Sequence, residues 1–167
     1  APTGSPATGT DAEQSSIAVS PEKEQEQESV VNKLARIPAN AAIEKLLESD
    51  RKRGRDNLTI SEMHDRLAQE EEDVAWAHYA ETQLRGHMDK LTQLFTTEAI
   101  ICRQTYCELQ IVSYQPNAQG LWQATMSLMR QQPWFSEFAG DSNISDASNG
   151  RTDLLVILPR KVRKEGR

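Results

Sequence analysis

The segment from 96 to 113, TTEAIICRQTYCELQIVS, contains both cysteines of the chain in a pattern typical of a β-hairpin. Ile100 and Cys102 alternate before a loop of four residues, and Cys107 and Leu109 alternate after it. Successive side chains of a strand point to opposite faces, so this loop length sets Cys102 opposite Cys107 and Ile100 opposite Leu109. The sequence therefore predicts a hairpin whose two cysteines share one face with apolar neighbours.

The two cysteines are poor candidates for a metal site. A zinc site requires about four ligands, and the histidines of the chain, His64, His78 and His87, lie far from the cysteines in sequence. We expect no metal and no other cofactor. A redox pair favours the Cys-x-x-Cys spacing at the start of a helix, whereas Cys102 and Cys107 are further apart and lie between strands.

A structural disulfide fits the same segment better. The loop 103–106 has no Gly, Asn, Asp or Pro, the residues that make tight turns easy, and directly opposed strand residues have the separation that a disulfide requires. We therefore predict that Cys102 and Cys107 are joined, which places the protein in an oxidising compartment. Thiol–disulfide redox chemistry and a pair of reduced cysteines in a cytosolic hairpin remain the alternatives.

The composition divides the chain into four segments. Residues 1–29 are Pro, Gly, Ser, Thr and Ala followed by Glu and Gln, too polar to offset the entropy of ordering, so we predict a flexible acidic linker. Residues 30–58 are expected to form short helices, residues 59–160 an α+β domain, and residues 161–167 a basic tail. Because the chain starts at alanine, we expect a processed product or an excised fragment from which a signal peptide or membrane anchor has been removed, with residues 1–29 as the tether to such an anchor.

Helical periodicity marks the first half of the chain. A first short helix is expected over 30–37, and a second follows Asn40 as N-cap, with Ile43, Leu46 and Leu47 on its buried side.

After this second helix, Thr59-Ile-Ser-Glu62 matches a capping box. The apolar residues that follow recur at steps of three and four, which predicts a long amphipathic helix, broken near 69–73. These residues are Met63, Leu67, Trp76, Ala80, Leu84, Met88, Leu91 and Phe95.

The sequence pattern of the second half of the chain predicts one more helix and one more strand. Residues 121–132 have a helical pattern, residues 141–149 read as a polar loop, and the apolar run 154–158 is typical of a strand buried on both faces. We expect an α+β fold: a helical N-terminal part followed by a helix–strand–strand–helix–strand, two-layer sandwich with a small three-stranded sheet. The crossover from the second strand to the third should leave the first strand between them.

The core of this sandwich is expected beneath the last helix. Trp122, with Leu121 and Leu128, should pack against the strand beside Leu155 and Ile157.

The sequence has no Gly-rich phosphate loop, nucleophile elbow or paired His/carboxylate motif, so we expect that the protein is not an enzyme. The run of acids over 70–73 is interpreted as the charged start of a helix. Candidate partner contacts are an aromatic segment, for which burial in the core is the competing interpretation, and the basic C-terminal residues. These candidates are Trp134, Phe135, Phe138, Arg160, Lys161, Arg163 and Lys164.

The class of function follows from these features together. We expect a non-enzymatic extracytoplasmic domain, periplasmic and tethered, that binds a protein or envelope component in assembly, sensing or regulation. The net charge of −6 disfavours a nucleic-acid partner, since such modules show a basic face. The alternatives are a thiol/disulfide redox protein using Cys102 and Cys107, and a cytosolic nucleic-acid-binding or chaperone-like protein using the basic tail.

Overall fold

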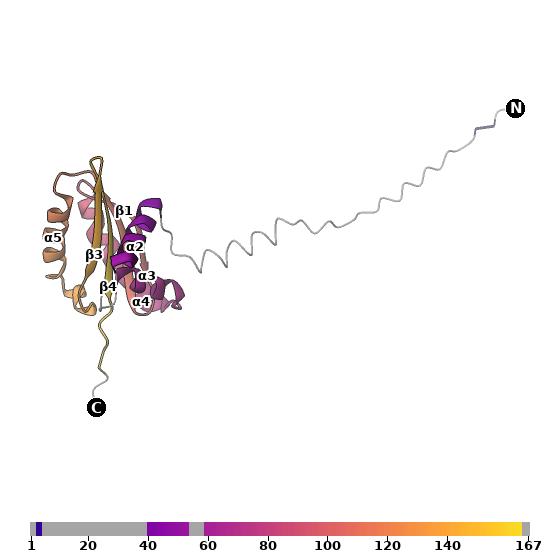
Figure 1. The fold of residues 1–167 in the computed structure, drawn as a ribbon. Coiled ribbons are helices and arrows are strands. Elements are labelled where there is room, and N and C mark those ends of the chain that lie inside the picture. Colours follow the sequence, from indigo (N-terminus) through magenta and orange to yellow (C-terminus); the bar gives the residue numbers. More distant parts are fainter. Residues whose placement is uncertain (1–2, 5–39, 54–58, 165–167) are drawn as a thin grey trace. The chain divides into compact units, whose positions relative to one another are not determined.

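The computed structural model describes residues 3–4, 40–53 and 59–164. The chain divides into two units, Ala1–Leu34 and Ala35–Arg167, and every described helix and strand belongs to the second. This second unit is a sheet with helices packed against it (Figure 1). The linker predicted over 1–29 and the helix predicted over 30–37 fall almost entirely outside the described residues.

The sheet has four strands, and every neighbouring pair is antiparallel. They are β1 (Thr96–Cys102), β2 (Tyr106–Ser113), β3 (Ser142–Ser148) and β4 (Arg151–Pro159), in the spatial order β1-β2-β4-β3. Together with the helices, this sheet confirms the α+β class. The edges of the sheet are β1 and β3.

The register of the β1–β2 hairpin is the one that the sequence predicts. Ile100 lies opposite Leu109 and Cys102 opposite Cys107. The loop between the strands is closed by a hydrogen bond of 3.0 Å from the Arg103 amide to the Tyr106 carbonyl oxygen.

The prediction of a polar loop over 141–149 is wrong, because this segment forms β3. Its residues pair regularly with β4, from Ser142 opposite Ile157 to Ser148 opposite Arg151. Asn149 and Gly150 connect the strands with φ angles of 53° and 76°, the left-handed values that a two-residue hairpin turn requires. An edge strand does not have to bury alternate side chains, so β3 lacks the apolar pattern that marks other strands.

The fourth strand also changes the expected topology. The predicted arrangement placed β1 between β2 and β4, but β2 pairs with β4 directly, with Glu108 opposite Ile157. The chain does cross over the sheet once with a strand left in between. This crossover connects β2 to β3, and the strand between them is β4. The β3–β4 turn then reverses the chain, which is why β4 is antiparallel to β2.

Helices cover both faces of the sheet, so three layers replace the expected two. One face is covered by α2 (Ala41–Arg53) and α3 (Ile60–Gln69), the other by α4 (Val74–Met88) and α5 (Ala118–Met129). Two short 3-10 helices, η1 (Asp89–Leu91) and η2 (Pro133–Glu137), follow α4 and α5.

The apolar run in β4 explains the three layers. Leu154, Val156 and Leu158 belong to the core beneath α4 and α5, whereas Leu155 and Ile157 belong to the core beneath α2 and α3. Alternate side chains of one strand therefore supply two separate cores, as the continuous apolar pattern predicts.

Side-chain caps set the starts of the helices. The Asn40 side chain accepts a hydrogen bond of 3.0 Å from the Ile43 amide, and Thr59 and Glu62 form the predicted capping box. The long helical pattern is interrupted where expected: α3 ends at Gln69, and Asp73 caps α4 by accepting from the Trp76 amide. These local predictions are confirmed because caps depend on residues within one turn.

The predicted surroundings of Trp122 are wrong. Trp122 is fully buried, but beneath α5 it shares a core with Leu154 and Val156, on the opposite face from Leu155 and Ile157. Leu128, expected in this core, is 57% exposed. The apolar residues of α5 fit two overlapping helical stripes, and the stripe that is buried is the one that contains Trp122, Met126 and Met129.

Candidate functional site

A disulfide joins Cys102 and Cys107, whose α-carbons are 4.0 Å apart. Cys102 is 1% exposed and Cys107 is fully buried, with both side chains in the core beneath α4 and α5. Thiol–disulfide exchange requires a thiolate to reach a sulfur atom of the bond. Both sulfur atoms belong to residues buried in this core, a position that suits a structural link.

The aromatic candidates for partner contact lie mainly inside the molecule. Phe135 and Phe138 are buried, and Trp134 is partly buried against them, with ring centroids 6.0 Å and 6.5 Å from those of Phe135 and Phe138. Edge-on contacts of this kind stabilise a core. In the described structure these residues act as core side chains.

Arg160, the first basic candidate, is held by structural contacts. Its guanidinium group lies 3.0 Å from the Asp73 carboxylate and 4.5 Å from the centre of the Trp76 ring. The hydrogen bond from Arg160, with that from the Trp76 amide, holds the pKa of Asp73 below its usual range. Arg160 therefore attaches the end of β4 to the start of α4.

The remaining basic candidates are exposed. Arg163 contacts Glu137 at 3.1 Å, but its side chain is 82% exposed, and Lys161 and Lys164 are also exposed. Exposed pairs of this kind contribute little to stability. These three cations remain candidates for partner contact.

The acidic run over 70–73 has two structural roles. Asp73 is the N-cap of α4, which agrees with the interpretation as a helix start. Glu70 instead holds the β1–β2 loop: its carboxylate accepts from the Thr105 amide at 2.9 Å, and its carbonyl oxygen accepts from Arg103 at 2.8 Å.

A buried polar cluster, which the sequence analysis missed, connects α3 to the middle of the sheet. The Glu108 carboxylate in β2 is fully buried and lies 2.6 Å from Nδ1 of His64. Gln110 donates to its other oxygen at 2.9 Å. No local pattern predicts this pair, because its members are separated by 44 residues.

The cluster changes the titration of His64. Burial acts to lower the pKa of His64, but the hydrogen bond and negative charge of Glu108 outweigh it, so the pKa is raised. Asp65 and Glu44 add smaller contributions in the same direction. Protonation of His64 thus strengthens the contact between α3 and the sheet.

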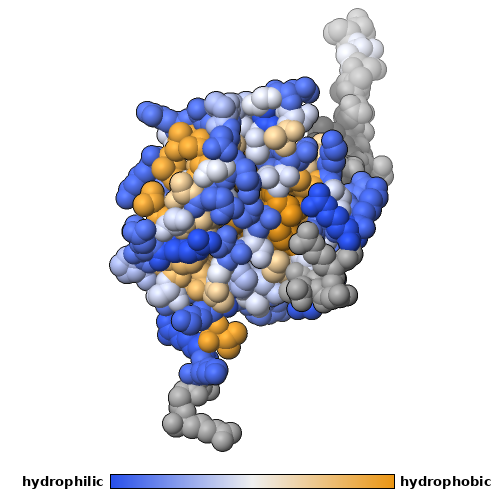
Figure 2. Space-filling view, turned by 60° about the vertical axis from the view of Figure 1, so that its left-hand side comes forward, coloured by the Kyte–Doolittle hydropathy of each residue, from blue (hydrophilic) through white to orange (hydrophobic). Residues whose placement is uncertain are grey.

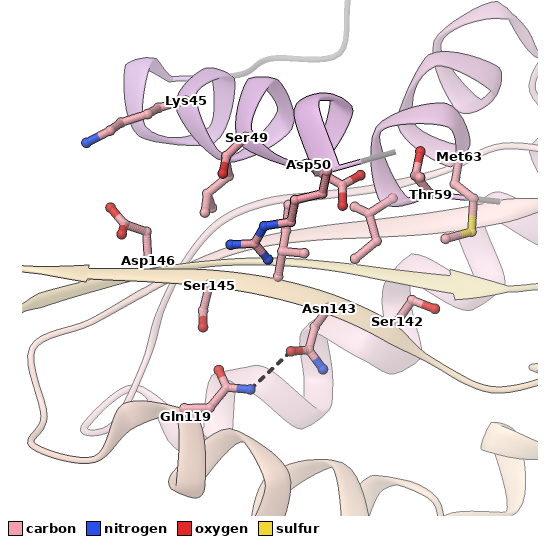
Figure 3. Close-up of a pocket in the computed structure, with 14 residues that line it drawn as sticks. Lys45, Ser49, Asp50, Thr59, Met63, Gln119, Ser142, Asn143, Ser145 and Asp146 are labelled. Carbon is pink, nitrogen blue, oxygen red and sulfur yellow. Dashed lines mark hydrogen bonds between the residues drawn. The ribbon is translucent and has the colours of Figure 1, made fainter. Parts of the chain in front are cut away.

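A groove of about 550 Å³ lies along the open edge of β3, between this strand and α2 (Figure 3). Lys45, Ser49 and Asp50 of α2 lie above the strand in this view, with Asp146 beside Lys45. Below the strand, Gln119 of α5 donates a hydrogen bond of 3.2 Å to Asn143. The groove therefore reaches both sides of β3, around its unpaired edge.

The two sides of the groove differ chemically. On the α2 side it is lined by apolar side chains of three elements, Leu46, Ile60, Met63 and Ile144, with charged residues at its rim. On the α5 side it is lined by the polar residues Gln119, Asn143 and Ser145. The sequence contains one signal of this site, the dipeptide Asn149–Gly150, which is typical of a two-residue hairpin turn and therefore of a strand on either side of it.

Other exposed apolar side chains do not form a competing site. The large exposed hydrophobic residues of the described chain are spread over several parts of it: Val74 and Tyr79 in α4, Tyr114 after β2, Leu128 in α5 and Val162 after β4. Figure 2 shows a largely polar surface on which hydrophobic residues gather in separate areas. Scattered apolar residues are normal on a protein surface.

Within residues 3–4, 40–53 and 59–164, no group of three or more His, Cys, Asp or Glu side chains is arranged to hold a metal ion. In the same part of the chain, no helix has the length and apolar character needed to span a membrane. Comparison with known proteins gives no match: no family model, curated protein or solved structure is significantly similar to this chain.

Proposed function

We propose that this chain is a non-enzymatic domain that binds another protein in an extracytoplasmic compartment. The observation that carries the proposal is the open edge of β3 with its groove. Main-chain groups at a strand edge provide hydrogen bonds for an incoming segment, and a groove beside them adds selective side-chain contacts. Binding through such a site assists assembly, sensing or regulation without chemical reaction.

The disulfide supports the compartment part of the proposal. A buried bond between Cys102 and Cys107 stabilises a short hairpin and persists where the surroundings are oxidising, as in the bacterial periplasm. A redox role has less support, because both cysteines are buried in the core. A role in nucleic-acid binding through the basic tail would rest on Lys161, Arg163 and Lys164, the exposed cations of the tail among the described residues.

Photo-crosslinking in the producing cells tests the proposal. A photoreactive amino acid at Ser145, in the groove, should give a specific protein adduct, whereas one at the exposed Gln123 of α5 serves as the control. Thiol trapping of the same cells should find Cys102 and Cys107 unavailable for alkylation. Free thiols in the native compartment, or no protein adduct from any exposed position tested around the domain, would contradict the proposal.

A further inference from the structure

β3 offers a complete strand edge to a partner. It pairs with β4 through seven consecutive residues without a register shift. Apart from the hydrogen bonds within the sheet itself, no backbone–backbone hydrogen bond of the described residues involves Ser142–Ser148. The outward main-chain groups of β3 are therefore available to pair with a further strand.

The α2 wall sets the spacing that a partner strand has to match. Lys45, Ser49 and Arg53 line the groove at intervals of four residues, so they share one side of the helix. A helix rises about 1.5 Å per residue, which places the backbone positions of Lys45 and Arg53 roughly 12 Å apart. A strand rises about 3.3 Å per residue, so roughly the same distance separates strand positions i and i+4.

The α2 wall of the groove has two cations, Lys45 and Arg53, and one acid, so its net charge is positive; Asp146 of β3, beside Lys45 in Figure 3, is a second acid in the groove. Lys45 and Arg53 are exposed and have no ion pair among the described residues, whereas the neighbouring cations Arg51 and Lys52 are paired with Asp65 and Glu48. The acidic residue of the same helix that lines the groove, Asp50, already accepts a hydrogen bond of 2.9 Å from the Ser61 amide. Acidic side chains on the partner would therefore complement the α2 wall.

From this geometry we propose that the groove binds an extended segment of another protein as a fifth strand beside β3, with the pattern acidic–x–apolar–x–acidic. Positions i, i+2 and i+4 of a strand face the same side. The two acidic side chains face Lys45 and Arg53, and the apolar side chain between them faces the surface formed by Leu46, Ile60, Met63 and Ile144. The x positions face Gln119 and Asn143, where polar side chains fit.

A second copy of the chain fits this edge less well. If two β3 strands paired about a twofold axis perpendicular to the sheet, both α2 helices would lie on the same face, beside the shared seam. Their groove-facing cations, Lys45 and Arg53, would then approach each other across the seam. Like charges in such positions are unfavourable, so the charge on α2 favours an acidic partner over self-association.

Titration of the whole ¹⁵N-labelled chain with a blocked peptide, Thr-Glu-Thr-Val-Thr-Glu-Thr, tests the inference. NMR shifts should saturate and concentrate on Ser142–Ser148 and on α2. The matched peptide Thr-Lys-Thr-Val-Thr-Lys-Thr should bind at least about tenfold more weakly. The variant Lys45→Glu/Arg53→Glu should reverse this preference, whereas Arg66→Glu/Lys90→Glu, with the same change in net charge at exposed positions outside the groove, should keep it.

Several results would overturn the inference. The first is a set of NMR shifts centred on β1 in place of β3. The second is equal affinity for the two peptides, or no saturable binding of either. The third is a dimer in sedimentation whose dissociation changes the NMR shifts of the β3 amides. The inference rests on the proposed protein-binding function, but the two fail separately. Adducts in cells from a position outside the groove, together with no peptide binding at β3, would retain the function and reject this site.

Discussion

The two edge strands of the sheet, β1 and β3, have different surroundings. β1 has an irregularity in its register between Thr97 and Ala99, and its last amide, at Cys102, donates a hydrogen bond of 2.9 Å to Glu81 of α4. The disulfide then fixes the same end of β1 to β2. β3 has regular pairing, no disulfide and a groove along its outer side.

Bulges and covering elements protect sheet edges from unwanted pairing. β1 has both of these features, whereas β3, with the sequence SNISDAS, has no Pro, no Lys and one charged residue. Edge protection is therefore a property of each strand and its neighbours and not of the sheet as a whole. This difference is the reason for proposing β3, and not β1, as the edge at which a partner strand pairs.

The largest expected effect comes from removing a side chain of the core beneath α4 and α5, which includes residues of β1 but none of β3. Trp122 is fully buried in this core, and its ring centroid lies 5.5 Å from that of Phe95, which precedes β1. Trp122→Ala should lower the free energy of unfolding by about 3–5 kcal/mol, as large-to-small core changes do. Urea denaturation followed by circular dichroism measures this loss.

Trp122→Phe is the matched control. The indole N–H of Trp122 is buried without a hydrogen-bond partner among the described residues, so removal of this group leaves no acceptor unpaired. The phenylalanine variant should therefore lose much less stability than the alanine variant. Equal losses would show that the volume of the side chain is not what stabilises this core.

The second effect concerns the layer that forms the wall of the β3 groove. His64→Leu removes the partner of the buried Glu108 carboxylate and should cost about 3 kcal/mol, because an unpaired buried charge is unfavourable. Hydrogen exchange should increase more in α2 and α3 than in β1. A loss below about 1 kcal/mol would contradict a charged pair at this position.

The same pair predicts a pH dependence. The pKa of His64 is raised in the folded state, so its contribution to stability is present below about pH 6.5, its ordinary value, and is lost as the pH rises through the folded-state pKa. Thermal unfolding at several pH values should show this loss in the parent. His64→Gln should lack it, and an identical profile in both proteins would contradict the assignment.

The third expected effect is a loss of stability at β1, the protected edge strand. Cys102→Ser/Cys107→Ser should lose about 2 kcal/mol, the value expected when the cross-link of a short loop is removed. Hydrogen exchange should rise at the β1–β2 hairpin and remain unchanged in β3. If the variant folded as well as the parent but lost partner binding, the disulfide would have a functional role instead.

The smallest expected effect is a loss of stability at β3, the open edge strand. Gly150 has a φ of 76° and open space where a side chain would begin, so Gly150→Ala adds only backbone strain, about 1 kcal/mol. Exchange should rise in β3 and not in β1, the reverse of the cysteine variant. The exposed helical glycine in Gly86→Ala is the control, and it should be neutral or stabilising.

Local features of the fold could be predicted from the sequence alone. The Asn40 and Thr59 caps, the break before Asp73 and the register of Cys102 with Cys107 depend on residues close together in the chain. The apolar run in β4 likewise predicted a strand buried on both faces. Each of these features has a strong pattern because a few neighbouring residues decide it.

The tertiary structure alone decided the site. β3 has polar side chains because it lies at an edge, so its identity as a strand depends on β4 and on the Asn149–Gly150 turn. The contact of His64 with Glu108 and the position of α2 above β3 both join segments distant in sequence. The sequence therefore determined the helices, the hairpin and its cross-link. Which strand edge stays open was decided by long-range packing, which no short pattern of residues encodes.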